Sequence, residues 1–418
     1  MKASVSSLAV ACSLAVGASF EAQDLAGPAT PAERRIEQAR LSITKAPGSA
    51  MGHVELALAL ARRARETADP GLYVRAEEAI AGALELAPDN FEAKRARAWV
   101  LLGQHRFAEA RELAEALNTR VPDDVMVYGL LTDANVELGD YERAEKACQW
   151  MLNLRPGSLP ALTRAAYLRE LFGDVEGALE LMAHASDATP MGEVEDRAWI
   201  LTQMAHLRLL TGDVHEAERL LGEALAAFPG YHYALAQLAK ARAAQGRRGE
   251  AAALLRQRYD TAPHPENLYD LALALGRAGR RGEADARFAE FEREALRETH
   301  GADNANRELV FYYADHARRP AEALAVARRE VARRRDVHTL DAYAWALYRA
   351  GQAAEARKVM EQVLAVGIRE ASILYHAGAI EARLGERASA SERLQQSLVL
   401  NPASDVAAEA RRALGRLR

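Results

Sequence analysis

Apolar residues recur along the chain at helical spacing, in short stretches that glycine, aspartate and proline interrupt at regular intervals. In the clearest stretch two amphipathic patterns, Val125 to Leu138 and Tyr141 to Leu154, flank the dipeptide Gly139-Asp140. Pro156 ends the second pattern because proline cannot donate the next helical hydrogen bond. Each helix is too short to be stable alone in water, and the pair leaves an apolar face open. We therefore expect it to stack on similar neighbours.

Similar neighbours are visible as a repeat of about 34 residues. Prolines mark one position of the repeat: Pro88, Pro122, Pro156, Pro190, Pro229, Pro263 and Pro402. Alanines mark a second position at spacings of 33, 34 or 39 residues: Ala76, Ala110, Ala144, Ala178, Ala217, Ala251, Ala284, Ala323, Ala356 and Ala390. A third position is small in most repeats: Ala64, Ala98, Ala166, Ala205, Ala239, Ala272, Ala344 and Gly378, with Thr132 and Phe311 as exceptions. A small side chain where two helices cross lets their backbones approach, so we predict that these residues are buried.

The pattern resembles the tetratricopeptide repeat, a helix-turn-helix unit of 34 residues. In the copy that contains Gly139-Asp140, the positions that match the family are Tyr128, Leu131, Ala144 and Pro156, and those that depart from it are Thr132 and Asn135. Ten such copies span residues 57 to 404. The resemblance implies an all-α fold, a right-handed superhelical solenoid of about ten helix-turn-helix repeats.

The domain organisation follows the repeats and their interruptions. Residues 32–298 are predicted to hold an N-terminal helix and repeats one to seven, and residues 299–404 repeats eight to ten. Extra residues after Pro190 are explained most simply by a longer first helix in repeat five. The irregular segment 297–305 separates the two groups and is our candidate hinge or sub-domain boundary. An Arg-rich helix over 405–418 is suited to covering the last apolar face.

The first residues differ from the rest of the chain. A positive start, a short apolar run and small residues near Ala18 read as a secretory signal peptide over residues 1–19, followed by a flexible leader over residues 20–31. We therefore expect an exported, periplasmic protein. A lipoprotein signal, with Cys12 as the acylated residue, is the alternative, and only in that case is a membrane association expected. Without the signal only Cys148 remains, so no intramolecular disulfide can form.

The charge and the motifs argue against several function classes. The formal net charge of -5 does not favour nucleic acid as a partner. Metalloprotease, P-loop, nucleophile-elbow and paired-cysteine motifs are missing, and the histidines do not have the spacing of a helical metal pair. The glycine-rich turn over residues 276–282 lies between two helical stretches, without the strand that a dinucleotide site requires. We predict no catalytic residue, no metal site and no cofactor.

The resemblance implies that the first helix of each repeat lines a concave groove. The residues at the groove-facing positions are Arg95, Trp99, Asp133, Tyr167, Trp199, His206, Tyr233, Lys240, Tyr269, Arg277, Tyr312, Asp341, Trp345, Tyr348, Arg349 and Tyr375. Aromatic and arginine side chains make good binding anchors because they bury a large area with little loss of rotamer freedom. The alternative for each aromatic residue is packing between adjacent first helices.

The sequence favours one of three functions. An exported, non-catalytic scaffold that binds a protein or peptide in its groove accounts for most of these features. The alternative is a lipid-anchored component of an outer-membrane assembly or polysaccharide-export machine. An enzyme with an attached repeat domain would need a second fold, for which the chain has no room. The family's lysine-and-asparagine clamp for a C-terminal carboxylate is not present, since the matching positions hold Arg95, Trp99, Asp133 and Thr163.

Overall fold

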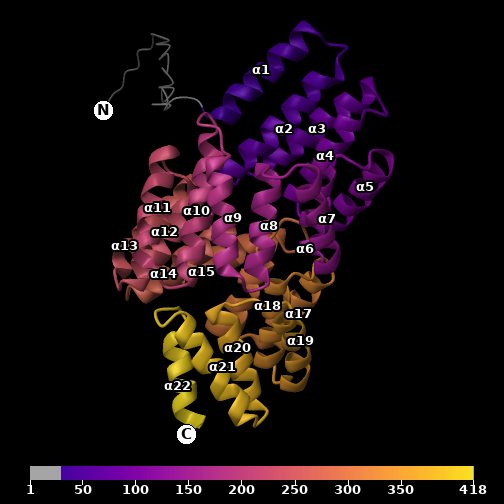
Figure 1. The fold of residues 1–418 in the computed structure, drawn as a ribbon. Coiled ribbons are helices and arrows are strands. Elements are labelled where there is room, and N and C mark those ends of the chain that lie inside the picture. The colour runs from indigo at the N-terminus through magenta and orange to yellow at the C-terminus, as the bar shows by residue number, and fades with distance from the viewer. Residues whose placement is uncertain (1–29, 418) are drawn as a thin grey trace, which may run out of the picture. The chain divides into compact units, whose positions relative to one another are not determined.

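The computed structural model describes residues 30–417, and the regular elements of that part of the chain are all helices (Figure 1). The first half contains α1 (Pro31–Lys45), α2 (Ala50–Thr67), α3 (Gly71–Leu86), α4 (Phe91–Gly103), α5 (Phe107–Arg120), α6 (Val125–Glu137), α7 (Tyr141–Leu154), α8 (Leu159–Leu171), α9 (Val175–Asp187), α10 (Val194–Leu210) and α11 (Val214–Ala227). The second half contains α12 (His232–Ala244), α13 (Arg248–Thr261), α14 (Pro265–Arg277), α15 (Arg281–Glu298), α16 (Asn306–Phe311), the π-helical segment η1 (Tyr312–His316), α17 (Pro320–Val331), α18 (Val337–Arg349), α19 (Ala353–Ala365), α20 (Ala371–Arg383), α21 (Arg387–Leu400) and α22 (Ala407–Leu417). The predicted signal peptide, Cys12 and the leader up to residue 29 lie outside the described residues.

Consecutive helices from α2 to α21 form ten pairs, with α1 before the first pair and α22 after the last. Figure 1 shows α2 beside α3 and α20 beside α21, and each pair packs on the next along the chain. The eighth pair is formed by α16, η1 and α17. The predicted all-α repeat solenoid is confirmed.

A recurring Gly-Asp dipeptide explains how the two helices of several pairs are joined. Gly139, Gly173 and Gly212 have φ angles of 75°, 82° and 81°, in the left-handed region that glycine adopts without steric cost. The aspartate that follows then caps the second helix. Asp174, for example, accepts a hydrogen bond from the backbone N–H of Gly177 at 2.9 Å. One dipeptide therefore ends one helix and starts the next.

The alanines that recur in register lie where helices cross. All ten members of the series from Ala76 to Ala390 are buried, as predicted. Gly378 occupies the other small position in the tenth repeat, and a Cβ atom there would lie 2.8 Å from Cγ of Leu394. Close helix packing thus depends on these small side chains.

The departures from the strict repeat have structural counterparts. The extra residues of repeat five lengthen α10 to 17 residues. In repeat eight, Phe311 stands where other repeats have a small residue, and the helix changes from α to π geometry at the next residue. The described chain from Pro31 onward forms one compact unit across the segment 297–305, our candidate hinge or sub-domain boundary.

Segments far apart in sequence meet at what we call the inter-turn seam, in which residues 137–141 lie against residues 334–337. The backbone N–H of Arg335 donates to the carbonyl oxygen of Glu137 at 3.0 Å, and the N–H of Val337 donates to Oη of Tyr141 at 2.8 Å. A Cβ atom on Gly139 would lie 2.5 Å from the carbonyl oxygen of Arg335. The third repeat therefore touches the start of the ninth.

A second contact of the same kind continues the seam by one repeat. A Cβ atom on Gly173 would lie 2.5 Å from the carbonyl oxygen of Gly367. A Cβ atom on Gly367 would in turn lie 2.9 Å from the carbonyl oxygen of Phe172. Repeat four thus touches the loop before repeat ten as closely as repeat three touches the loop before repeat nine.

Candidate binding site on the inner helices

A cavity of about 230 Å³ opens on the face formed by α4, α6 and α8. We call the first helices of the repeats, such as α4, α6 and α8, the inner helices, and this cavity the inner-helix cavity. Its walls are Leu102, His105, Phe107, Thr132, Asp133, Val136, Glu137, Arg164, Tyr167 and Leu168. Two of the groove residues predicted from sequence, Asp133 and Tyr167, are among these residues. A site that combines apolar walls with a few placed polar groups is the usual composition of a ligand pocket.

The helices position the polar side chains of the cavity in fixed pairs. Asp133 and Glu137 lie four residues apart on α6 and therefore share one face of that helix. Arg164, on α8, donates from Nε to Oδ1 of Asp133 at 2.8 Å and from Nη2 to Oδ2 at 2.6 Å. This two-bond geometry holds both side chains in one orientation.

The inter-turn seam brings a further charged residue into contact with two residues of the cavity wall. The guanidinium of Arg334 lies 3.3 Å from Oε2 of Glu137 and 5.9 Å from the ring centroid of Phe107. Asp336 lies 3.4 Å from the same guanidinium. Because Arg334 belongs to the loop before α18, its contacts with Glu137 and Phe107 depend on the inter-turn seam.

Burial shifts the protonation equilibria of the cavity. It raises the pKa of Glu137 to about 7, and the charge of Asp336 adds to this effect. Burial also raises the pKa of Tyr167 well above its ordinary value and lowers the pKa of His105. Tyr167 is nevertheless 38% exposed. Tyr167 lines the cavity, and groups with perturbed pKa values gather at functional sites.

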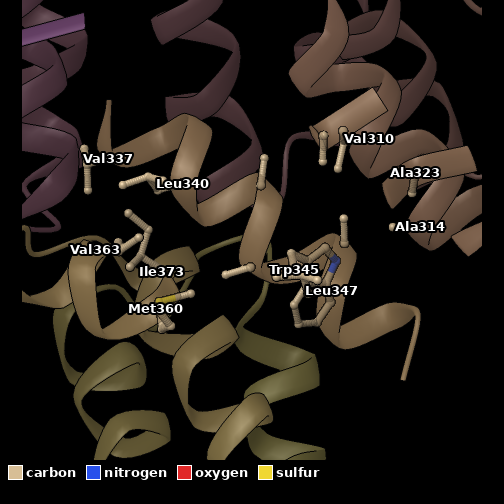
Figure 2. Close-up of a cluster of buried hydrophobic side chains, with 14 of the residues drawn as sticks. Val310, Ala314, Ala323, Val337, Leu340, Trp345, Leu347, Met360, Val363 and Ile373 are labelled. Atoms are coloured by element: carbon tan, nitrogen blue, oxygen red, sulfur yellow. The ribbon is translucent and has the colours of Figure 1, made fainter. Parts of the chain in front are cut away.

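Three of the predicted groove residues are buried. Trp345 lies among apolar side chains in Figure 2, and its Nε1–H donates to Oδ2 of Asp315 at 3.0 Å. Asp341 accepts a hydrogen bond from Nδ1 of His376 at 2.9 Å, and the ring centroid of Tyr269 lies 5.1 Å from that of Phe291. Their environment is that of packing residues, because burial removes them from contact with a ligand. A binding role for them stays a prediction.

Several other predicted residues are engaged in ion pairs. Arg95 pairs with Asp124 at 2.5 Å, and Arg277 pairs with Asp405 at 2.9 Å. The remaining pairs are His206 with Glu170 at 2.8 Å and Arg349 with Asp315. Lys240 is exposed. These contacts are compatible with a solvent-exposed groove wall. Ion pairs on such a surface contribute little to the stability of the fold.

The remaining predicted aromatics are half-buried and pack against the hydrophobic clusters of neighbouring repeats: Trp99, Trp199, Tyr233, Tyr312, Tyr348 and Tyr375. Among the aromatic residues predicted to face the groove, Tyr167 is exposed and also lines the cavity. The structure therefore brings Asp133 and Tyr167 together at the cavity. It also gathers four other predicted residues in a second cluster, in which Tyr348, Tyr375 and Arg349 contact the ring of Trp345.

Sequence reasoning missed the wall residues His105, Glu137 and Arg164, and it missed Arg334, which pairs with Glu137. The spacing of Glu137 from Asp133 carried a usable signal, since residues four apart share a helix face. No such signal existed for Arg334, which lies 197 residues after its partner Glu137.

The described residues also bear on metal binding, membrane insertion and thiol chemistry. Within residues 30–417, no three His, Cys, Asp or Glu side chains are grouped to hold a metal ion, and no helix is long and apolar enough to cross a membrane. Cys148 is buried, and burial raises the pKa of its thiol to about 11. Such a thiol is a poor nucleophile at neutral pH, in agreement with a packing role.

The comparisons with known proteins agree with this architecture. The tetratricopeptide repeat family matches residues 68–134. No curated protein sequence matches the chain. Among solved structures, the human IFIT1 dimer with PPP-AAAA is similar, with 15% identity, a TM-score of 0.51, and coverage of 87% of each chain.

Two further structures show weaker similarity. Yeast Tom70 has 13% identity and a TM-score of 0.42, and the match covers 91% of this chain and 90% of that one. The thermophilic tetratricopeptide repeat protein TTC0263 from Thermus thermophilus has 22% identity and a TM-score of 0.40, over 46% of this chain and 98% of that one. At such identities the likeness concerns the fold. The tetratricopeptide repeat family thus matches residues 68–134, and the ten helix pairs with buried alanines in register show that the same helix-pair architecture continues through the described chain.

Proposed function

We propose that this protein is an exported, non-catalytic scaffold that binds a peptide segment of another protein on its inner helices. The observation that carries the proposal is the inner-helix cavity, with an accessible Tyr167 ring beside the fixed Asp133–Arg164 pair. A tyrosine anchor supplies a large contact area with little rotamer loss. The tetratricopeptide repeat fold is that of a protein-interaction scaffold, which supports this assignment.

The pairing of the charged groups favours recognition over catalysis. The carboxylate of Asp133 is held by two bonds from Arg164, and Glu137 lies beside Arg334. Groups held in such pairs are preorganised for a partner, and we assign no reaction to them.

Selection of a random-peptide display library against the mature protein tests the proposal. Peptides that bind the wild type are expected to bind Tyr167→Ala at least about tenfold more weakly, since hot-spot aromatics contribute about 2 kcal/mol or more. Trp150→Ala is the matched control, because Trp150 is 52% exposed on α7 and does not line the cavity. Equal binding by Tyr167→Ala and wild type would rule the cavity out as the binding site.

Export is the second part of the proposal, and it depends on residues 1–19. The mass of the purified mature protein tests it directly. Cleavage near Ala18 supports a signal peptide, whereas a lipid attached to Cys12 supports the lipid-anchored alternative. An intact Met1 on protein from the native host would contradict both.

A further inference from the structure

The walls of the inner-helix cavity combine apolar and acidic side chains. Leu102, Val136 and Leu168 supply aliphatic surface, and Asp133 and Glu137 supply carboxylates. Lysine and arginine side chains have the complementary composition, an apolar stem that carries a cationic head. A volume of about 230 Å³ corresponds to several water molecules of roughly 30 Å³ each, which is space for one long side chain.

Three carboxylates share the cationic groups next to the cavity. The guanidinium of Arg334 lies within ion-pair distance of three carboxylates: Glu330 at 3.2 Å, Glu137 at 3.3 Å and Asp336 at 3.4 Å. Arg333 adds a contact to Glu330 only at 4.0 Å. The guanidinium of Arg334 is therefore shared among three carboxylates, and the charge of Arg307 acts on Glu137 and Asp336 as well. A further cation would be attracted to carboxylates that share their cationic partners.

The cation on the opposite wall is already committed to partners. Arg164 donates to both carboxylate oxygens of Asp133, and also to the carbonyl oxygens of Gly129 at 3.2 Å and Pro160 at 3.0 Å. These bonds leave its guanidinium little capacity to bind an anion. An anionic ligand would in addition meet the carboxylate of Glu137.

The raised pKa of Glu137, to about 7, agrees with this arrangement. Burial is its main cause, the charge of Asp336 adds to it, and Arg334, Arg307 and His338 oppose it. Burial outweighs the charges that favour ionisation, so a further cation beside Glu137 would stabilise its ionised form. A bound cation would supply that charge, and the exposed ring of Tyr167 offers it an aromatic face.

We infer that the inner-helix cavity is a pocket for one lysine or arginine side chain of the bound segment. The carboxylate of Glu137 receives the cationic head, and Tyr167 with the aliphatic walls holds the stem. This inference rests on the proposed function, because it names the chemistry of the segment that the inner helices bind. It also predicts direct binding of small cations that carry no peptide.

Butylguanidinium is the peptide-free probe, and butanoate of similar size is its anionic counterpart. In titrations followed by NMR of the full mature protein, butylguanidinium is expected to bind saturably and at least about tenfold more tightly than butanoate. Glu137→Gln is expected to lose at least about tenfold of that affinity, since it removes the charge and keeps the shape. Glu142→Gln is the matched control, because the Glu142 side chain is 78% exposed on α7.

Two further measurements keep the test decisive. Far-UV circular dichroism checks the fold of Glu137→Gln, and Tyr167→Leu is a second variant that removes the aromatic face and retains apolar volume. Equal affinity of wild type and Glu137→Gln for butylguanidinium, or tighter binding of butanoate, would overturn the inference.

The peptide selection separates this inference from the proposed function. In peptides whose binding depends on Tyr167, replacing the enriched lysine or arginine by norleucine should weaken binding at least about tenfold. If such peptides bind but show no need for a cationic residue, the pocket assignment fails and the scaffold proposal stands. If no peptide depends on Tyr167 while butylguanidinium still binds at Glu137, the scaffold proposal fails and the cation pocket stands.

Discussion

At the scale of single residues, the sequence was most informative where steric fit determines which residues are buried. The alanine series from Ala76 to Ala390 could be predicted to be buried, because only a small side chain fits between crossing helices. The aromatic residues at the predicted groove-facing positions were harder to interpret. Trp345 and Tyr167 are both suited to line a groove, yet Trp345 is buried and Tyr167 is exposed. The difference depends on Asp315 and His376, which pack around Trp345 and lie 30 and 31 residues away from it.

Enlarging one of these alanines should destabilise the protein. Ala144 is fully buried, so Ala144→Leu is expected to lower the free energy of unfolding by about 1–3 kcal/mol through overpacking. Urea denaturation measures the change. Ala108, which is exposed on α5, provides the control, and Ala108→Leu should change stability by no more than about 0.5 kcal/mol. Equal effects of the two substitutions would contradict the packing role.

Glu137 should make stability depend on pH. Its pKa is about 7 in the folded state against an ordinary value of 4.5, so the folded protein binds this proton more tightly than the unfolded chain. Its contribution to stability is therefore present below about pH 4.5 and is lost as the pH rises through about 7. Urea denaturation of wild type and Glu137→Gln across this range measures the difference, and the variant should show a flatter profile. Glu142→Gln, as an exposed control, should retain the wild-type decline over the same window.

At the scale of helices, the repeat and its Gly-Asp turns predicted ten pairs and most of their boundaries. Val125 to Leu138 and Tyr141 to Leu154 were expected, and α6 and α7 run from Val125 to Glu137 and from Tyr141 to Leu154. The π-helical segment Tyr312–His316 was not foreseen. Its residues carry no local pattern that distinguishes π from α geometry, although Phe311 at a small position marked the repeat as unusual.

Two helical glycines should respond in opposite directions to alanine. Alanine stabilises an open helix by about 0.5–1 kcal/mol relative to glycine, and Gly222 in α11 has no atom within 4 Å of a new Cβ. Gly378 in α20 has Cγ of Leu394 at 2.8 Å and the carbonyl oxygen of Ala390 at 3.1 Å, so the clash should outweigh propensity. Thermal denaturation should show a higher Tm for Gly222→Ala and a lower one for Gly378→Ala. A higher Tm for both variants would mean that the contact between α20 and α21 can accommodate a methyl group at position 378.

At the scale of the whole described unit, the sequence predicted the stack but not the inter-turn seam. The repeat describes each pair and its neighbour, and a contact such as Arg335 to Glu137 spans nearly half the chain. Two loops can meet because of the curvature of the solenoid, without any repeated spacing between them in the sequence. The sequence spacing therefore does not predict such contacts. The ion pair between Arg334 and Glu137 was beyond prediction for the same reason.

The seam should open when a methyl group is added to it. Gly139→Ala places Cβ 2.5 Å from the carbonyl oxygen of Arg335, so the amides of Arg335 and Val337 should exchange hydrogen faster than in the wild type. Gly212→Ala has the same positive φ but no atom within 4 Å, and it is the control for backbone strain alone. Equal exchange in both variants would show that the seam does not restrain these amides.

The two seam contacts restrict how the length of this protein can change. In an open array each unit touches only its neighbours, so copy number can drift by duplication or loss of one unit. Here Gly139 and Gly173 are matched to loops 196 and 194 residues further on. Deleting or inserting one helix pair between them would offset both matches at once, so the copy number in this interval is fixed by geometry.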